Sequence, residues 1–154
     1  MRIHPWHPVV VHFPIACWTI AVLIDVAQLG GALPERAATL VPGAEPAALS
    51  FALLWLGIGF GLLAMILGFV DFLRLPDRLQ RSGAVSWHIG AMTGAWALFL
   101  AAAMLRPTPA VPVTPAPLLA TLLEIAGFAC LVCGGVLAAT VVFEDWPRSA
   151  ASRE

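Results

Sequence analysis

The chain has 154 residues, of which 60% are hydrophobic and 11% are charged, and its formal net charge is −1. Soluble domains contain about 45–50% apolar and about 25% charged residues, and a soluble core of this length cannot bury so much apolar surface. The composition therefore excludes an ordinary soluble domain, and the absence of a basic excess leaves no surface for nucleic acid. We expect one integral membrane domain over residues 1–154, in contact with the lipid bilayer.

Four apolar runs are long enough to cross a bilayer, which takes about 20 helical residues at a rise of 1.5 Å each. They cover residues 9–29, 49–73, 85–105 and 118–142. The connections between them are rich in Gly, Pro or charge, as expected where helices end. No small-residue cleavage site follows the first run, so it is expected to remain as a membrane helix. The sequence thus predicts an all-α, polytopic four-helix bundle.

The arginines predict how the bundle is oriented. If both termini face the cytoplasm, six of the eight arginines lie inside and only Arg36 and Arg106 lie outside. Trp6, Trp87 and Trp146 then all fall at the cytoplasmic interface, where indole rings prefer to lie. Both signals favour an N-in, C-in protein of the bacterial inner membrane.

In this orientation three ionisable side chains share one depth near the cytoplasmic edge of the membrane. His12 lies near the start of the first helix, His88 near the start of the third, and Asp71 near the end of the second. Ionisable groups in a membrane usually pair with one another or serve a function. We expect His12 to face the bundle. His4 is expected to be peripheral, and His7 is ambiguous because about one helical turn separates it from His12.

Two imidazoles on different helices suit the axial ligation of haem b, or they can join a carboxylate around a non-haem metal ion. On this hypothesis His12 and His88 are the ligands, His7 is an alternate ligand, and Asp71 orients an imidazole. Two alternatives remain open: a polar clasp in a structural or partner-binding membrane subunit, and a proton relay in a small proton-coupled transport component. No catalytic residue is assigned, because the chain shows no nucleophile–base pair and no phosphate-binding loop.

Helix periodicity gives further expectations about packing. The second helix carries a stripe of small residues that leads to Asp71 and lets another helix approach closely: Gly57, Gly61, Ala64 and Gly68. Pro14 is expected to kink the first helix next to His12, with Pro8 as the first helical residue and His7 as its cap.

Other polar or reactive residues are expected to have structural roles. Asp25 and Glu124, near the opposite membrane edge, are expected to snorkel or cap, or else to share a proton or pair with Arg36 or Arg106. Cys130 and Cys133 form a C-x-x-C pair in mid-helix without a nearby cation, which favours packing over redox chemistry.

The stretch from His7 to Ala16, HPVVVHFPIA, resembles the His-Pro-x-x-Val-His-Phe-Pro-Ile-Ala opening of bacterial membrane proteins grouped as domain of unknown function 2231. The Gly68–Asp71 segment and His88 are similar to that family too, so the resemblance covers most of the chain. It implies a membrane fold and a site near the opening motif, but no reaction. Some members are joined to Rieske-type iron–sulfur domains, which implies an association with electron transfer. Possible partners are other membrane subunits or a second copy of the chain.

Overall fold

The computed structural model describes residues 6–32, 45–107 and 115–140, and every regular element within these ranges is a helix. In chain order the helices are α1 (Trp6–Val10), α2 (His12–Leu29), α3 (Pro46–Phe72), α4 (Asp77–Gln80), α5 (Gly83–Met104) and α6 (Leu118–Thr140). Four segments are long and apolar enough to cross a membrane: Trp6–Leu29, Pro46–Phe72, Gly83–Met104 and Leu118–Thr140. The predicted all-α membrane protein with four spanning helices is confirmed.

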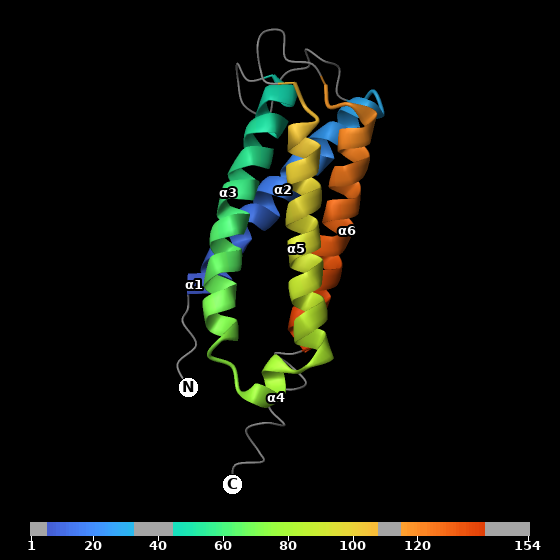
Figure 1. Ribbon diagram of the computed structural model, residues 1–154. Coiled ribbons are helices and arrows are strands. Elements are labelled where there is room, and N and C mark those ends of the chain that lie inside the picture. Colours follow the sequence, from blue (N-terminus) through green and yellow to red (C-terminus); the bar gives the residue numbers. More distant parts are fainter. Residues whose placement is uncertain (1–5, 33–44, 108–114, 141–154) are drawn as a thin grey trace.

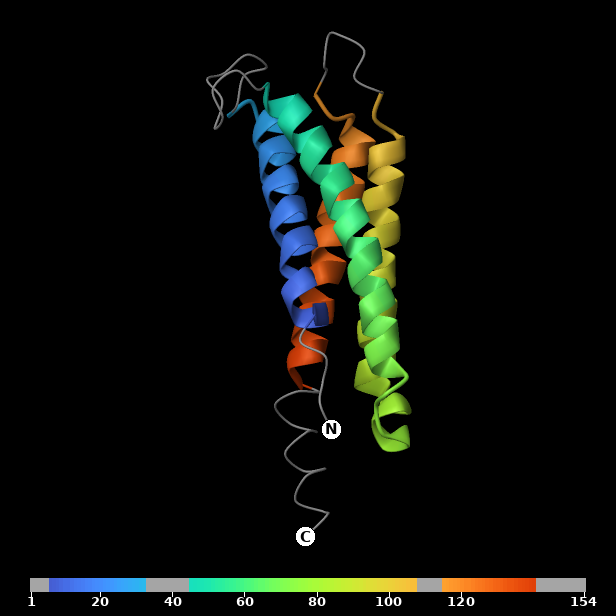
Figure 2. The same cartoon turned by 90° about the vertical axis from the view of Figure 1, so that its left-hand side faces the viewer.

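The four long segments run alternately up and down, so α1 begins and α6 ends at the same end of the bundle (Figure 1). Helix α2 packs mainly on α3, and α5 packs mainly on α6. Helices α3 and α5 lie close together where α3 begins and diverge toward α4, and the view turned by 90° shows α2 and α3 diverging in the same direction (Figures 1 and 2). The bundle is therefore closed at one end and spread at the other.

The core between these pairs is centred on Trp18 of α2, which stacks on Phe99 of α5 with ring centroids 4.4 Å apart. Small residues on α3 make room for this indole: a Cβ at Gly61 would lie 2.8 Å from Trp18 Cη2, and one at Gly57 would overlap the same ring. The predicted small-residue stripe thus allows α2 to approach α3 closely.

Pro14 explains the break between α1 and α2. Proline has no N–H to donate to the carbonyl four residues earlier, here that of Val10, and its ring crowds that carbonyl. The missing hydrogen bond interrupts the helix at Val11, whose backbone angles stay helical and whose N–H still donates to the His7 carbonyl at 3.1 Å. The expected cap at His7 is wrong, because the helix begins at Trp6 and Pro8 lies within its first turn, where no helical donor is lost.

The outer surface of the long helices is apolar. Large side chains exposed there include Leu23, Leu62, Leu118 and Val136. Such a surface is stable in the hydrocarbon of a bilayer, as expected of a membrane protein.

Candidate ligand-binding cavity

A cavity of about 470 Å³ lies at the spread end of the bundle, bounded by α1, α2, α3, α5 and α6. Its walls are mainly apolar and include the side chains of Phe69, Phe72, Met65, Met92 and Trp96. His7, Asp71 and His88 are among the polar side chains that line it. A predominantly apolar cavity of this size with a few polar groups is typical of small-molecule and cofactor sites, which span about 300–1,000 Å³.

His7 is held against α3 on one side of the cavity. Its Nδ1–H donates to the main-chain oxygen of Ala64 at 2.9 Å. The ring lies over Gly68, where a Cβ would come within 2.9 Å of His7 Cε1. Since a carbonyl oxygen only accepts, this bond fixes the proton of the neutral ring on Nδ1 and leaves the lone pair on Nε2 free.

His88, which lies on α5, is held in the same way by α6. Its Nδ1–H donates to the main-chain oxygen of Gly134 on α6 at 2.8 Å. Gly134 has no side chain to interfere, and a Cβ there would overlap the side chain of Met92. The Nε2 atom of His88 is therefore also the nitrogen available to a ligand.

The structure places His12 elsewhere. It is exposed on the outer surface of α2, where its Nδ1–H donates to the Pro8 carbonyl at 2.6 Å, and it does not line the cavity. The expectation that His12 faces the bundle is wrong. The inward face of α2 carries Pro14, Trp18 and Asp25, all of them buried.

A signal in the sequence identifies that inward face. At 100° per residue, Pro14, Trp18 and Asp25 share one face of the helix, about 140° from His12. A charged carboxylate cannot face lipid without a large cost, so Asp25 marks the side that must turn toward protein. His7 precedes Pro14 by seven residues, two helical turns, which brings it to the same side.

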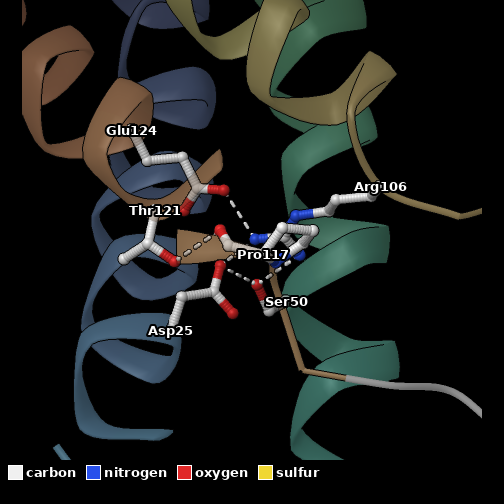
Figure 3. Close-up of polar contacts among 6 residues, drawn as sticks. All are labelled: Asp25, Ser50, Arg106, Pro117, Thr121 and Glu124. Carbon is white, nitrogen blue, oxygen red and sulfur yellow. Dashed lines mark hydrogen bonds and ion pairs between the residues drawn. The ribbon is translucent and has the colours of Figure 1, made fainter. Parts of the chain in front are cut away.

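A second polar cluster closes the opposite end of the bundle and joins all the long helices (Figure 3). Arg106, just beyond α5, forms ion pairs with Asp25 of α2 and with Glu124 of α6, the latter at 2.5 Å. Ser50 of α3 donates to Asp25 Oδ2 at 2.6 Å and accepts from Arg106 Nη1 at 3.1 Å. The side chains of Asp25 and Glu124 are fully buried, so the expected snorkelling is wrong and the alternative, pairing with Arg106, is confirmed.

The grouping of metal-ligating side chains among the described residues bears on which ligand the cavity can hold. Within residues 6–32, 45–107 and 115–140, no three His, Cys, Asp or Glu side chains come together as a metal site. Two imidazoles that line one cavity from different helices suit an occupant that brings most of its own coordination sphere, as a porphyrin does. Cys130 and Cys133 are free thiols on α6 that do not line the cavity.

Comparison with protein families gives one match. A family model described as predicted membrane protein (DUF2231) matches residues 3–147, which include the opening motif, the cavity and the ion-pair cluster. Comparison with curated proteins and with solved structures gives no significant match.

Proposed function

The chain belongs to the DUF2231 family of predicted membrane proteins, and we propose that it is a redox module of the bacterial cytoplasmic membrane that binds haem b between His7 and His88. The observation that carries the proposal is the matched pair of hydrogen bonds at the two imidazoles. Each Nδ1–H donates to a main-chain carbonyl of a neighbouring helix, and each ring lines the same cavity.

This pattern is the one that metal-ligating histidines use. A ligating imidazole almost always donates its other N–H to a carbonyl or carboxylate, which fixes the tautomer and orients the ring. His7 is held by α3 and His88 by α6, so the two rings approach an occupant from different sides. His7 replaces His12 as the ligand on the first span, because His12 lies on the lipid-facing surface.

The walls of the cavity fit a flat, apolar macrocycle. The aromatic side chains of Phe69, Phe72 and Trp96, with Met65 and Met92, provide apolar contact for the faces and edges of a porphyrin. Asp71 lies half-buried on the same wall. If haem is bound in this cavity, the Asp71 carboxylate would place a negative charge beside it, which would favour the oxidised, more positive form and lower the reduction potential.

The same hydrogen bonds favour a second candidate, a structural subunit in which the histidines only hold helices together. His7 ties α1 to α3, and His88 ties α5 to α6. Polar contacts between membrane helices contribute about 0.6 kcal/mol on average. A purely structural role therefore predicts small losses of stability and no bound pigment.

The test is haem binding by the purified protein. The protein is prepared in mild detergent, supplied with haem b, and examined by reduced-minus-oxidised absorbance. We expect the spectrum of a low-spin haem with two imidazole ligands in the wild type. His7→Ala and His88→Ala should each lose it, because either substitution removes an axial ligand. His12→Ala is the matched control and should keep it.

Two results would contradict the haem proposal. A wild-type protein that stays colourless after haem supplementation supports the structural candidate. Unchanged spectra in both His7→Ala and His88→Ala would show that the pigment is bound elsewhere. Thermal unfolding of the haem-free variants, expected to lie within about 1 kcal/mol of wild type, separates loss of a ligand from loss of the fold.

A further inference from the structure

The ion-pair cluster at the closed end of the bundle has an unbalanced formal charge. Arg106 provides one positive charge, and Asp25 and Glu124 provide two negative charges when both are ionised. The two carboxylate side chains are 0% exposed and the arginine side chain is 4% exposed. A net charge in such a position lacks the solvation that water gives it, so the cluster is stable only when the extra negative charge is neutralised.

Among the described residues, the hydrogen bonds of the cluster leave one oxygen of each carboxyl group without a partner. Within the described part of the chain, Asp25 Oδ1 and Glu124 Oε2 are buried and have no hydrogen-bond partner. The polar side chains around them include Ser50, which donates to Asp25, and Thr121, which donates to the Pro117 carbonyl at 3.5 Å (Figure 3). Arg106 Nε is also buried and has no hydrogen-bond partner in the part of the chain that the structure describes. Protonation of one carboxyl would balance the charge, and its O–H would be a donor in a cluster where two carboxyl oxygens lack one.

We propose that this cluster is a proton-binding site that holds one exchangeable proton, carried by Glu124. The two carboxylates differ in the donors they receive. Asp25 Oδ2 accepts from both Arg106 Nη2 and Ser50 Oγ, whereas Glu124 Oε1 accepts from Arg106 alone. Hydrogen bonds from donors stabilise the ionised form, so Asp25 is the carboxylate and Glu124 the acid. This site is separate from the haem cavity and does not depend on it.

Charge balance predicts how many carboxyl groups in the cluster are protonated in the wild type and in each variant. The number of protonated carboxyls in the cluster equals the number of carboxyls minus the number of cations. The wild type therefore holds one, and Glu124→Gln holds none because the amide replaces the acid. Asp25→Asn also holds none, because Glu124 then becomes the single carboxylate that pairs with Arg106.

The experiment is infrared spectroscopy of the haem-free full-length protein in lipid bilayers at neutral pH, in H₂O and in D₂O. We expect a carbonyl band of a protonated carboxylic acid in the wild type, shifted to lower frequency in D₂O as the proton exchanges. The band should disappear in Glu124→Gln and in Asp25→Asn. Asp71→Asn, which changes the half-buried acid of the cavity, is the control and should keep the band.

The proposal is overturned if the wild type lacks the band, if either cluster variant keeps it, or if Asp71→Asn loses it. Glu124→Gln is nearly isosteric, and a wild-type-like circular dichroism spectrum and elution volume will show that it is folded. Because the protein is studied without haem, the result does not depend on whether haem binds at the cavity.

Discussion

At the residue scale, Gly68 determines how closely His7 can lie against α3. The imidazole of His7 occupies the space that any side chain at position 68 would need, with its Cε1 atom 2.9 Å from the site of a Cβ. The Nδ1 bond to the Ala64 carbonyl depends on this close approach. Gly68 is thus a positioning residue for the proposed ligand.

Gly68→Ala is expected to weaken haem binding by about 10- to 100-fold, the range typical of changes to groups that orient a metal ligand. The added methyl group would displace the His7 ring, and with it Nε2, the nitrogen that is proposed to bind the haem iron. Haem titration followed by absorbance measures the change.

Gly59→Ala is the matched control. Gly59 lies on the same helix, and nothing lies within 4 Å of the Cβ that the substitution adds. It should leave haem affinity unchanged and raise helix stability by up to about 1 kcal/mol, the difference in helix propensity between Gly and Ala. Equal affinities in the two variants would show that Gly68 does not position the ligand.

Two of the residues on the cavity wall, Asp71 and His88, were predicted from the sequence because intramembrane charges and helix depth indicate a shared polar site. His7 was predicted only as an alternate. The choice between His7 and His12 depends on helix phase, and the helical backbone angles of Val11 carry that phase from Pro14 back to His7. Helix phase taken from Asp25, and not from His12, therefore indicates the inward face.

At the element scale, the break between α1 and α2 separates the helix that carries His7 from the helix that carries Trp18. Four spanning helices were predictable, since the length of an apolar run directly reflects the thickness of the bilayer. Helix α4, Asp77–Gln80, was not predicted. It has four residues and only Leu79 buried, so it leaves no apolar periodicity to detect.

Pro14→Ala is expected to restore a helical donor to the Val10 carbonyl and to join α1 and α2 into one straight helix. Straightening moves His7 away from Ala64, so haem affinity should fall at least tenfold. The free energy of unfolding of the haem-free protein should stay within about 1 kcal/mol, because the gained hydrogen bond offsets the lost contact. Haem titration and denaturation of the same samples measure both quantities.

Pro8→Ala serves as the comparison, because Pro8 lies in the first helical turn, where its nitrogen has no partner to lose. It should change stability by less than about 0.5 kcal/mol and leave haem affinity as it is. A loss of affinity in Pro8→Ala as large as in Pro14→Ala would contradict the role assigned to the break.

At the scale of the whole molecule, the bundle has two different ends. The cavity with His7 and His88 lies at the end where α1 begins, and the ion-pair cluster lies at the end where α5 finishes and α6 starts. The core around Trp18 and Phe99 lies between the two. The distribution of arginine predicts that the cavity end faces the cytoplasm.

Reporter fusions test this orientation. A fluorescent protein that matures only in the cytoplasm should be active when fused at either terminus, and alkaline phosphatase, which needs the periplasm, should be inactive at both. Alkaline phosphatase inserted between α2 and α3 should be active. Active alkaline phosphatase at the C-terminus would reverse the orientation and place the cavity at the periplasmic face.

The salt bridge between Arg106 and Asp25 fixes the first spanning segment near one of its ends, so a change of tilt there moves the other end. About 18 residues separate Asp25 from His7 along the first span, or about 27 Å at 1.5 Å per residue, so a tilt of about 5° at the cluster moves the far end by about 2 Å. That displacement is about ten times the variation of about 0.2 Å that a metal–ligand distance tolerates. The ion pairs that hold α2 at the Arg106 cluster therefore also limit how far His7, at the opposite end of the first span, moves relative to α3.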